Sequence, residues 1–263
     1  MNSIFDSVIH GLDVPSGLQF FKADTFPTIN PVHWLVSHFA VGGYSPLQRL
    51  SGMLTVHMTQ IKPHNGFYWH PHRGLEIYTY VIDGELYHED TTGGKGVIRA
   101  GEVQRMFSGY FIQHQELNLT DEYTRVIQIW FVAGVEHMGL EPHYEQVALA
   151  DMPPRSLGDG VVRDIIGPNG ATDSHVDARL TSTILSSGGQ ATIELPQPGE
   201  ELFLYFVKGH GRIQSPTLAQ SISRYDVVIA TPDADTAVIT AGEEPLNYLS
   251  FYLKPFLSPN GTT

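Results

Sequence analysis

Short β-prone runs, each closed by a turn rich in glycine, are the feature of this sequence that most limits its fold. Residues 75–82 form a run of β-branched and aromatic side chains that ends at Asp83-Gly84, and residues 86–89 form another that ends at Thr91-Thr-Gly-Gly94. Further runs of this kind occupy residues 96–99, 101–107 and 124–132. Short strands at this spacing are typical of an antiparallel sandwich or a small barrel. The chain is therefore expected to be all-β.

The same pattern occurs a second time later in the chain. ELFLYFV at residues 201–207 leads into Lys208-Gly209, as residues 76–82 lead into Asp83-Gly84, and a shift of about 125 residues superposes the two halves. An internal duplication is therefore expected, with a segment rich in glycine and proline between the copies. The predicted domains are residues 1–140, a connection at 141–175, and residues 176–263.

Composition excludes several classes of function. The formal net charge of −13, without a basic cluster, disfavours nucleic acid and an anionic membrane surface as partners. The chain has no cysteine, which excludes disulfides, thiolate metal sites and a thiol nucleophile. No signal-peptide pattern and no apolar stretch near the roughly 18 residues of a membrane span are present, so we expect a cytoplasmic protein.

Two pairs of ligand-type side chains occur in the first copy. His70 and His72 are two residues apart, as are His114 and Glu116. Residues i and i+2 of a strand point to the same face, so each pair projects together into the barrel. Three imidazoles and one carboxylate suit a first-row divalent ion, namely Fe(II), Ni, Co, Cu, Mn or Zn, and the spacing does not choose among them. The same parity, continued along the chain, places Glu76, Tyr78 and Tyr80 on that side.

A structural interpretation of these residues has to be weighed against metal binding. With 13 histidines in the chain, chance alone supplies roughly 0.6 His-x-His pairs. The second copy acts as an internal control, because it retains the strand pattern but lacks the ligand types. The duplication shift places the four candidate positions on Leu195, Gln197, Val238 and Thr240. The fold therefore does not require these histidines, which favours a metal-binding role for them.

The segments His70-Pro-His-Arg-Gly-Leu-Glu76, Tyr80-Val-Ile-Asp-Gly-Glu85, His88-Glu-Asp90 and GVIRAGEVQ at 96–104 together resemble the pirin signature. Pirins are bicupins, that is, tandem β-barrels of the cupin type. The resemblance implies one iron in the N-terminal barrel, held by His70, His72, His114 and Glu116, and a degenerate C-terminal barrel. The sequence departs from the usual pattern at Tyr110-Phe111, where pirins carry Arg-Gly, and at Gln115, where they carry serine.

The resemblance further implies a quercetin 2,3-dioxygenase (quercetinase), an oxidoreductase that opens flavonols with O₂ and releases carbon monoxide. Glu116 is then the expected catalytic base for the substrate hydroxyl. Three residues, Glu76, Tyr78 and Arg73, are expected to surround the ligands, with Glu76 orienting them through hydrogen bonds. Aromatic walls for a small planar substrate are expected from Phe67, Trp69, Phe107, Tyr110 and Phe111.

Two other functions remain open at this point. Some pirins act as regulators whose metal or redox state controls binding to a protein partner, and the acidic charge of this chain suits a protein better than DNA. A cupin isomerase that acts on a sugar or a carboxylic acid would use the same kind of site. The sequence alone does not separate these functions from the dioxygenase.

Overall fold

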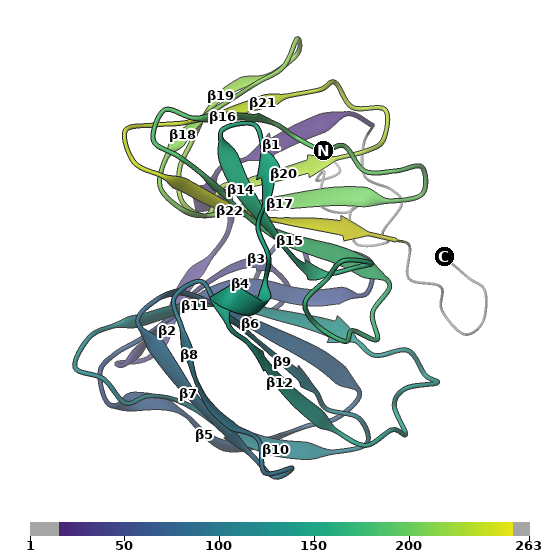
Figure 1. Ribbon diagram of the computed structural model, residues 1–263. Helices are drawn as coiled ribbons and strands as arrows, with labels where there is room; N and C mark the ends of the chain where they lie inside the picture. The colour runs from purple at the N-terminus through teal and green to yellow at the C-terminus, as the bar shows by residue number, and fades with distance from the viewer. Residues whose placement is uncertain (1–15, 255–263) are drawn as a thin grey trace.

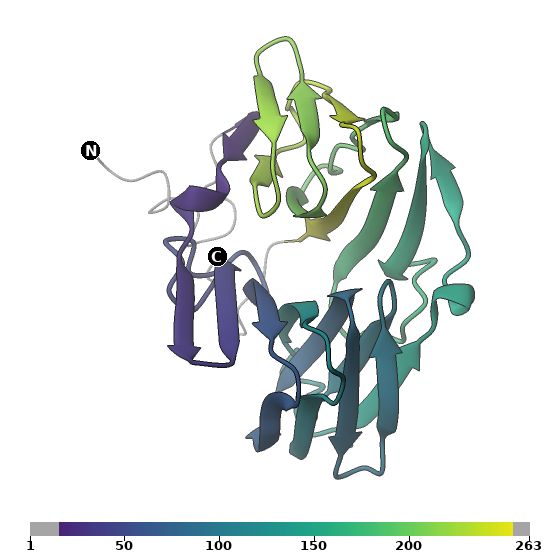
Figure 2. The same ribbon diagram turned by 90° about the vertical axis from the view of Figure 1, so that its left-hand side faces the viewer.

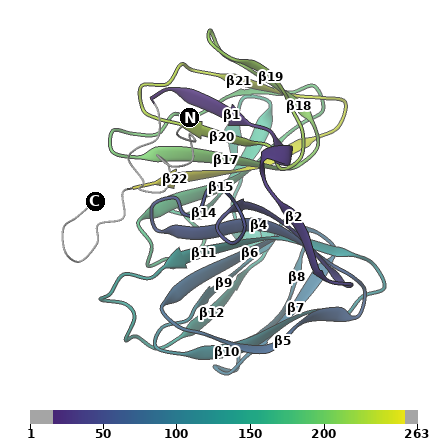
Figure 3. The ribbon, with the colours of Figure 1, turned by 180° about the vertical axis from the view of Figure 1, so that it is seen from behind.

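The fold of the chain is two stacked barrel-like halves, seen in a computed structural model that describes residues 16–254. Each half contains a seven-stranded and a four-stranded sheet, and every strand pairing within them is antiparallel. Figure 1 shows the first half below the second, and Figures 2 and 3 show the same stacking after rotations of 90° and 180°. The expected all-β, duplicated architecture is confirmed.

The larger sheet of the first half has the order β12-β9-β6-β11-β4-β3-β2. Its strands are β2 (Thr28–Val32), β3 (Leu35–Val41), β4 (Met53–Ile61), β6 (Leu75–Asp83), β9 (Val103–Phe107), β11 (Thr124–Val132) and β12 (His143–Val147). The smaller sheet has the order β5-β10-β7-β8. Its strands are β5 (Asn65–His72), β7 (Glu85–Asp90), β8 (Lys95–Arg99) and β10 (Ile112–Asn118).

The second half repeats this arrangement. Its larger sheet has the order β1-β20-β17-β22-β15-β14-β13 and its smaller sheet the order β16-β21-β18-β19. The larger sheet contains β1 (Leu18–Phe21), β13 (Arg155–Leu157), β14 (Gly160–Ile166), β15 (Ala178–Leu185), β17 (Glu201–Lys208), β20 (Val227–Ala230) and β22 (Leu246–Leu253). The smaller sheet contains β16 (Gln190–Thr192), β18 (Gly211–Gln214), β19 (Ala219–Ile222) and β21 (Val238–Ala241). Two short 3₁₀ turns, η1 (Ala23–Thr25) and η2 (Leu149–Asp151), complete the described elements.

The chain does not divide into halves at one point. Strand β1, near the N-terminus, pairs with β20 in the second half, as Figures 1 and 3 show. The segment expected as a connection, residues 141–175, supplies β12 to the first half and β13 and β14 to the second. Glycine and proline mark the turns between short strands, but they do not reveal which sheet a strand joins. The simple boundaries at residues 140 and 176 therefore differ from the structure.

The two large sheets pack back to back and share an apolar core between the halves. Strands β6 and β17 lie at equivalent places in them and are buried on both faces. Side chains from β6, such as Tyr80, join side chains from β17, such as Phe203, in this core. On β6, even-numbered residues therefore face the other half, and odd-numbered residues face the interior of the first barrel.

The interiors of the two barrels differ in how they are filled. One large apolar cluster fills the second barrel and includes Ala191 of β16 and Ile239 of β21, which are Cα partners. Two smaller clusters flank the interior of the first barrel, one around Leu86 and Ile98 and the other around Ile77 and Met106. Across residues 16–254, no helix combines the length and apolar character that a membrane span requires.

Candidate metal centre

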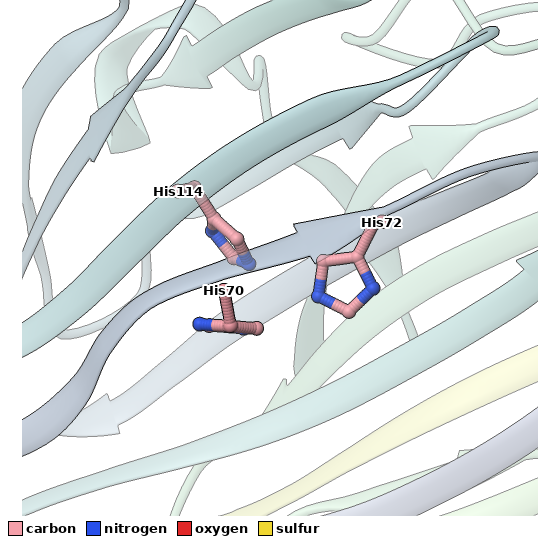
Figure 4. Close-up of side chains that lie close together, drawn as sticks. All are labelled: His70, His72 and His114. Atoms are coloured by element: carbon pink, nitrogen blue, oxygen red, sulfur yellow. The ribbon is translucent and has the colours of Figure 1, made fainter.

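Three histidines of the first barrel converge on one point. His70 of β5 and His114 of β10 are Cα partners across the two strands, and His72 lies on the same face as His70. The ring centroids are 4.3 Å apart for His70 and His114, and 5.0 Å apart for each of the other two pairs. One nitrogen of each ring lies within 4.8 Å of a nitrogen of the other two. Figure 4 shows the three rings gathered between the strands.

Glu116 lies beside this group and is buried. It forms a second potential metal-binding group with His88 and His114, whose donor atoms also lie within 4.8 Å of one another. His114 therefore belongs to both groups. Of the four ligands predicted from the sequence, the three histidines form one group, and Glu116 belongs to a second group that shares His114 and adds His88.

Three polar side chains fix the Glu116 carboxylate. Its Oε1 accepts hydrogen bonds from the hydroxyl of Thr79, at 3.2 Å, and from the side-chain amide of Gln104. Its Oε2 accepts one from Nε2 of Gln128, at 2.9 Å. A carboxylate has about four lone-pair positions, so one of them stays available for a metal or a substrate proton.

The donor set fits a divalent metal ion. Both ring nitrogens of His114 are buried without a hydrogen-bond partner within the described chain, which is costly for an isolated imidazole. Burial, followed by the neighbouring His70, His88 and His72, lowers the pKa of His114 to about 2. Burial, followed by His70, lowers the pKa of His72 to about 4. Both rings are therefore neutral at neutral pH, as metal ligation requires.

One ring of the group has a defined tautomer. Nδ1 of His70 lies 2.7 Å from the carbonyl oxygen of Tyr68, so Nδ1 carries the proton and donates it there. Nε2 of His70 then has the free lone pair that a metal requires. A backbone carbonyl that fixes the non-ligating nitrogen is a common support for ligand histidines.

An irregularity in β5 determines which of its side chains face the centre. The register with β10 changes between the pairs His114–His70 and Glu116–Phe67, so one extra residue of β5 lies between them. This bulge turns Phe67 onto the same face as His70, where it lines the cavity. Trp69, next to His70, points outward and is 48% exposed.

A cavity of about 550 Å³ opens on the three histidines and Glu116. Its walls are mainly apolar, with Trp130 edge-on to His72 at a centroid distance of 5.1 Å. The other apolar side chains that line it are Ile29, Pro31, Leu35, Phe39, Leu54, Phe67 and Ile77. Four polar side chains from the large sheet also line it, namely Ser37, Thr55, His57 and Gln128.

Four of the five aromatic residues expected as pocket walls lie elsewhere. Trp69 points outward, as described above, and Phe107 is buried against His175, with ring centroids 4.5 Å apart. The Tyr110 hydroxyl donates to Glu141, at 3.0 Å. The Phe111 ring lies 5.6 Å from the Arg73 guanidinium carbon. Aromatic residues in barrels serve as core more often than as ligand walls, and only Phe67 meets the expectation.

The residues expected to surround the ligands also lie elsewhere in the structure. Glu76 and Tyr78 lie on the far face of β6, where the Tyr78 hydroxyl donates to Glu76 at 2.7 Å and Arg105 Nε donates to Glu76 at 2.8 Å. Arg73 is exposed. The physical reason is the turn at Gly74, with φ of +63°, which separates β5 from β6 and breaks the strand parity that started at His70.

Residues that the sequence interpretation missed take those places. Glu116 accepts hydrogen bonds from Thr79, Gln104 and Gln128. For Thr79 the sequence signal was strand alternation, because Thr79 lies between the outward-facing Tyr78 and Tyr80. His88 was also missed as part of the centre. Its ring stacks on Tyr144 at a centroid distance of 4.1 Å and an interplanar angle of 6°.

Comparisons with known proteins place this chain among related sequences. Residues 31–131 match the family model described as "Pirin". A Pasteurella multocida protein named "Putative quercetin 2,3-dioxygenase" is 31% identical over 199 residues, which cover 72% of this chain and 82% of that protein. A pirin-like protein of Caulobacter vibrioides is 32% identical over 191 residues, which cover 69% of this chain and 78% of that protein.

A solved structure extends the likeness to both halves. The bacterial pirin YhhW of Escherichia coli, in complex with nickel(II), has a TM-score of 0.73 and 26% identity. The match covers 90% of this chain and 99% of that one. The tandem-barrel fold expected from the sequence is therefore confirmed.

Proposed function

The chain belongs to the pirin family, and from this membership we propose that it is a metal-dependent dioxygenase that opens the ring of flavonols such as quercetin. The Pasteurella multocida relative, which is named "Putative quercetin 2,3-dioxygenase" and is 31% identical, supports this reaction class. The donor set described above supports the metal dependence.

In this proposal, His70, His72, His114 and Glu116 hold one divalent ion. A bound ion supplies Lewis-acid chemistry, since it lowers the pKa of a coordinated hydroxyl and orients the substrate ring. Fe(II) is the ion that the family resemblance implies, and the Escherichia coli pirin structure holds nickel(II). Three nitrogen donors and one oxygen donor accept either ion.

The single observation that carries the proposal is the cavity on which these ligands open. Its volume of about 550 Å³ and its mostly apolar walls suit a flat aromatic molecule. Phe67 and Trp130 flank the histidines, with ring centroids 6.3 Å from His70 and 5.1 Å from His72 respectively. A flavonol that enters with its 3-hydroxyl and 4-oxo groups first would place its polar edge at the ligands and its rings against these walls.

When the substrate oxygen binds, Glu116 would give up its position at the ion and accept the proton of the 3-hydroxyl. Gln104 and Gln128 donate to its two oxygens and keep the carboxylate turned toward the cavity. A positioned carboxylate is an effective general base for an acidic hydroxyl within hydrogen-bond reach. The apolar walls exclude water around the resulting anion, which strengthens its interaction with the charged centre. The overall reaction consumes O₂ and yields a ring-opened ester and carbon monoxide.

The test is a turnover assay with defined metal content. Protein loaded separately with Fe(II), Ni(II), Co(II) or Cu(II) is mixed with quercetin under O₂, and loss of flavonol absorbance and release of carbon monoxide are followed. We expect turnover with at least one ion, loss of turnover in Glu116→Gln, and unchanged turnover in the control His64→Ala, since His64 is exposed and bonds to Asp121. Full loading without turnover by any of the four ions would contradict the proposal.

A further inference from the structure

His57 is a polar side chain of the cavity that the proposed chemistry does not use. It lies on β4, in the large sheet, whereas His70, His72 and His114 come from β5 and β10 of the small sheet. Its Cα partner on β11 is Gln128, and both side chains line the cavity. Because Gln128 donates to Glu116, His57 lies one strand away from the support of the metal centre.

The hydrogen bonds around His57 fix its tautomer. The Thr55 hydroxyl donates its only proton to the carbonyl oxygen of Val41, at 2.8 Å. That hydroxyl also lies 3.1 Å from Nδ1 of His57, so there it must act as the acceptor. Nδ1 of His57 therefore carries the ring proton. Nε2 keeps a lone pair, and no group of residues 16–254 bonds to it.

The surroundings keep this ring fixed and uncharged. It stacks on Phe39, with ring centroids 4.5 Å apart and an interplanar angle of 23°. Burial lowers the pKa of His57 to about 4. At neutral pH the ring is thus a neutral hydrogen-bond acceptor in a mostly apolar cavity. It would attract a hydroxyl and would not attract a carboxylate.

We infer that Nε2 of His57 recognises a phenolic hydroxyl of the ligand, at a position away from the groups that meet the metal, and so selects hydroxylated planar aromatics over unsubstituted ones. The identity of the ligand as a flavonol rests on the proposed function. The acceptor itself follows from Thr55, Val41 and Phe39. Leaving Nε2 without a partner when a ligand displaces water is costly, which creates the selectivity.

The experiment compares two flavonols that share the 3-hydroxy-4-oxo edge, namely quercetin and 3-hydroxyflavone. Binding to the zinc-loaded protein is measured by calorimetry, because zinc is redox-inert and separates binding from turnover. One hydrogen bond of this kind predicts a preference of roughly tenfold for quercetin in the wild type. We expect the ratio of dissociation constants to fall close to one in His57→Phe, which keeps a ring against Phe39 but lacks the acceptor.

Two further variants provide a control for the substitution and an independent test of the acceptor. His64→Phe makes the same change at an exposed histidine and should leave the ratio unchanged. Thr55→Val removes the acceptor that fixes the tautomer and should lower the ratio even if His57→Phe fails to fold. A folded, zinc-binding His57→Phe or Thr55→Val protein that retains the wild-type ratio would overturn the inference.

The result of this binding experiment can be distinguished from the result of the turnover assay that tests the proposed function. If no ion supports turnover but the ratio depends on His57, the dioxygenase proposal fails and the recognition stands. If turnover occurs and the ratio of dissociation constants does not depend on His57, only the recognition by His57 fails. If neither flavonol binds the zinc-loaded protein, the recognition fails, and the turnover assay with the other four ions decides the dioxygenase proposal by itself.

Discussion

Nε2 of His88 lies 2.9 Å from Oδ2 of Asp90, and neither side chain is accessible to solvent. Burial alone would raise the pKa of Asp90, but the hydrogen bonds from His88 and Thr92 outweigh it and hold that pKa below its ordinary value. Asp90 is therefore a carboxylate that fixes the proton of His88 on Nε2. Nδ1 of His88 keeps a lone pair without a partner among the described residues, and His88 belongs to one group with His114 and Glu116.

This pair predicts a loss of metal affinity when Asp90 is removed. In Asp90→Ala, His88 loses the partner that fixes its tautomer beside His114 and Glu116, and we expect the affinity for Ni(II) or Fe(II) to fall by up to about 10-fold. Competition with a chelator of known affinity measures the change. Glu89→Gln is the matched control, because Glu89 lies next in the strand and its ion pair with Lys95 is on the outer face. Equal affinity in the wild type and Asp90→Ala would exclude a supporting role for the pair.

Adjacent residues on opposite faces of β6 should have separable effects. The Tyr80 hydroxyl accepts a hydrogen bond from the Asn247 amide, at 2.8 Å, and one from Ser182, at 3.1 Å, at the contact between the halves. Tyr80→Phe leaves both donors without this acceptor, and we expect a loss of about 1–3 kcal/mol in unfolding free energy with unchanged metal affinity. Denaturant unfolding and metal titration measure the two quantities. Weakened metal binding in this variant would mean that Tyr80 faces the metal centre after all.

Thr79→Val is the counterpart on the inner face. It removes one of the hydrogen bonds to Glu116 without a large change in volume. We expect metal affinity to decrease by up to about 10-fold, since side chains that support a ligand tune its binding. The unfolding free energy should change less than in Tyr80→Phe. A variant that binds metal as tightly as the wild type would show that Gln104 and Gln128 suffice to hold the carboxylate.

An ion pair between the halves predicts an acid-sensitive contribution to stability. Asp83 of β6 accepts hydrogen bonds from Lys208 of β17, at 2.6 Å, and from Arg125. Burial opposes the shift, but these two partners outweigh it and lower the pKa of Asp83. A lowered pKa in the folded state means that the stabilisation is present above the unfolded pKa of roughly 4 and is lost as the pH falls through the folded value.

We therefore expect Asp83→Asn to be less stable than the wild type by about 1 kcal/mol at pH 7, since the pair is only partly buried. The difference should shrink as the pH falls below roughly 4. Urea unfolding at a series of pH values measures it. A difference that grows toward acid pH would contradict the assigned sign.

Sequence reasoning identified the strands and the residues that converge, for physical reasons that are visible in the structure. His70 with His72, and His114 with Glu116, were grouped by the two-residue period of a strand, and that period holds within β5 near its end and within β10. The buried strand at 75–82 and its copy at 201–207 were recognised from continuous apolar runs, which is how strands buried on both faces appear.

The misassigned residues lie where the period is interrupted. The turn at Gly74 reversed the predicted side of Glu76 and Tyr78. Pairing partners such as Gln128 and His57 come from strands distant in sequence, and a single sequence does not supply their register. Nothing in the structure explains why Tyr110-Phe111 stands where pirins usually carry Arg-Gly.

The central claim is that His70, His72, His114 and Glu116 hold one metal ion in the first barrel. Its most direct test is the metal content of protein purified without added metal, measured by mass spectrometry for the wild type, His114→Ala and the exposed control His64→Ala. We expect about one ion per chain in the wild type and in His64→Ala, and almost none in His114→Ala, because His114 belongs to both groups of potential ligands. A folded His114→Ala protein that retains its full metal content would contradict the claim.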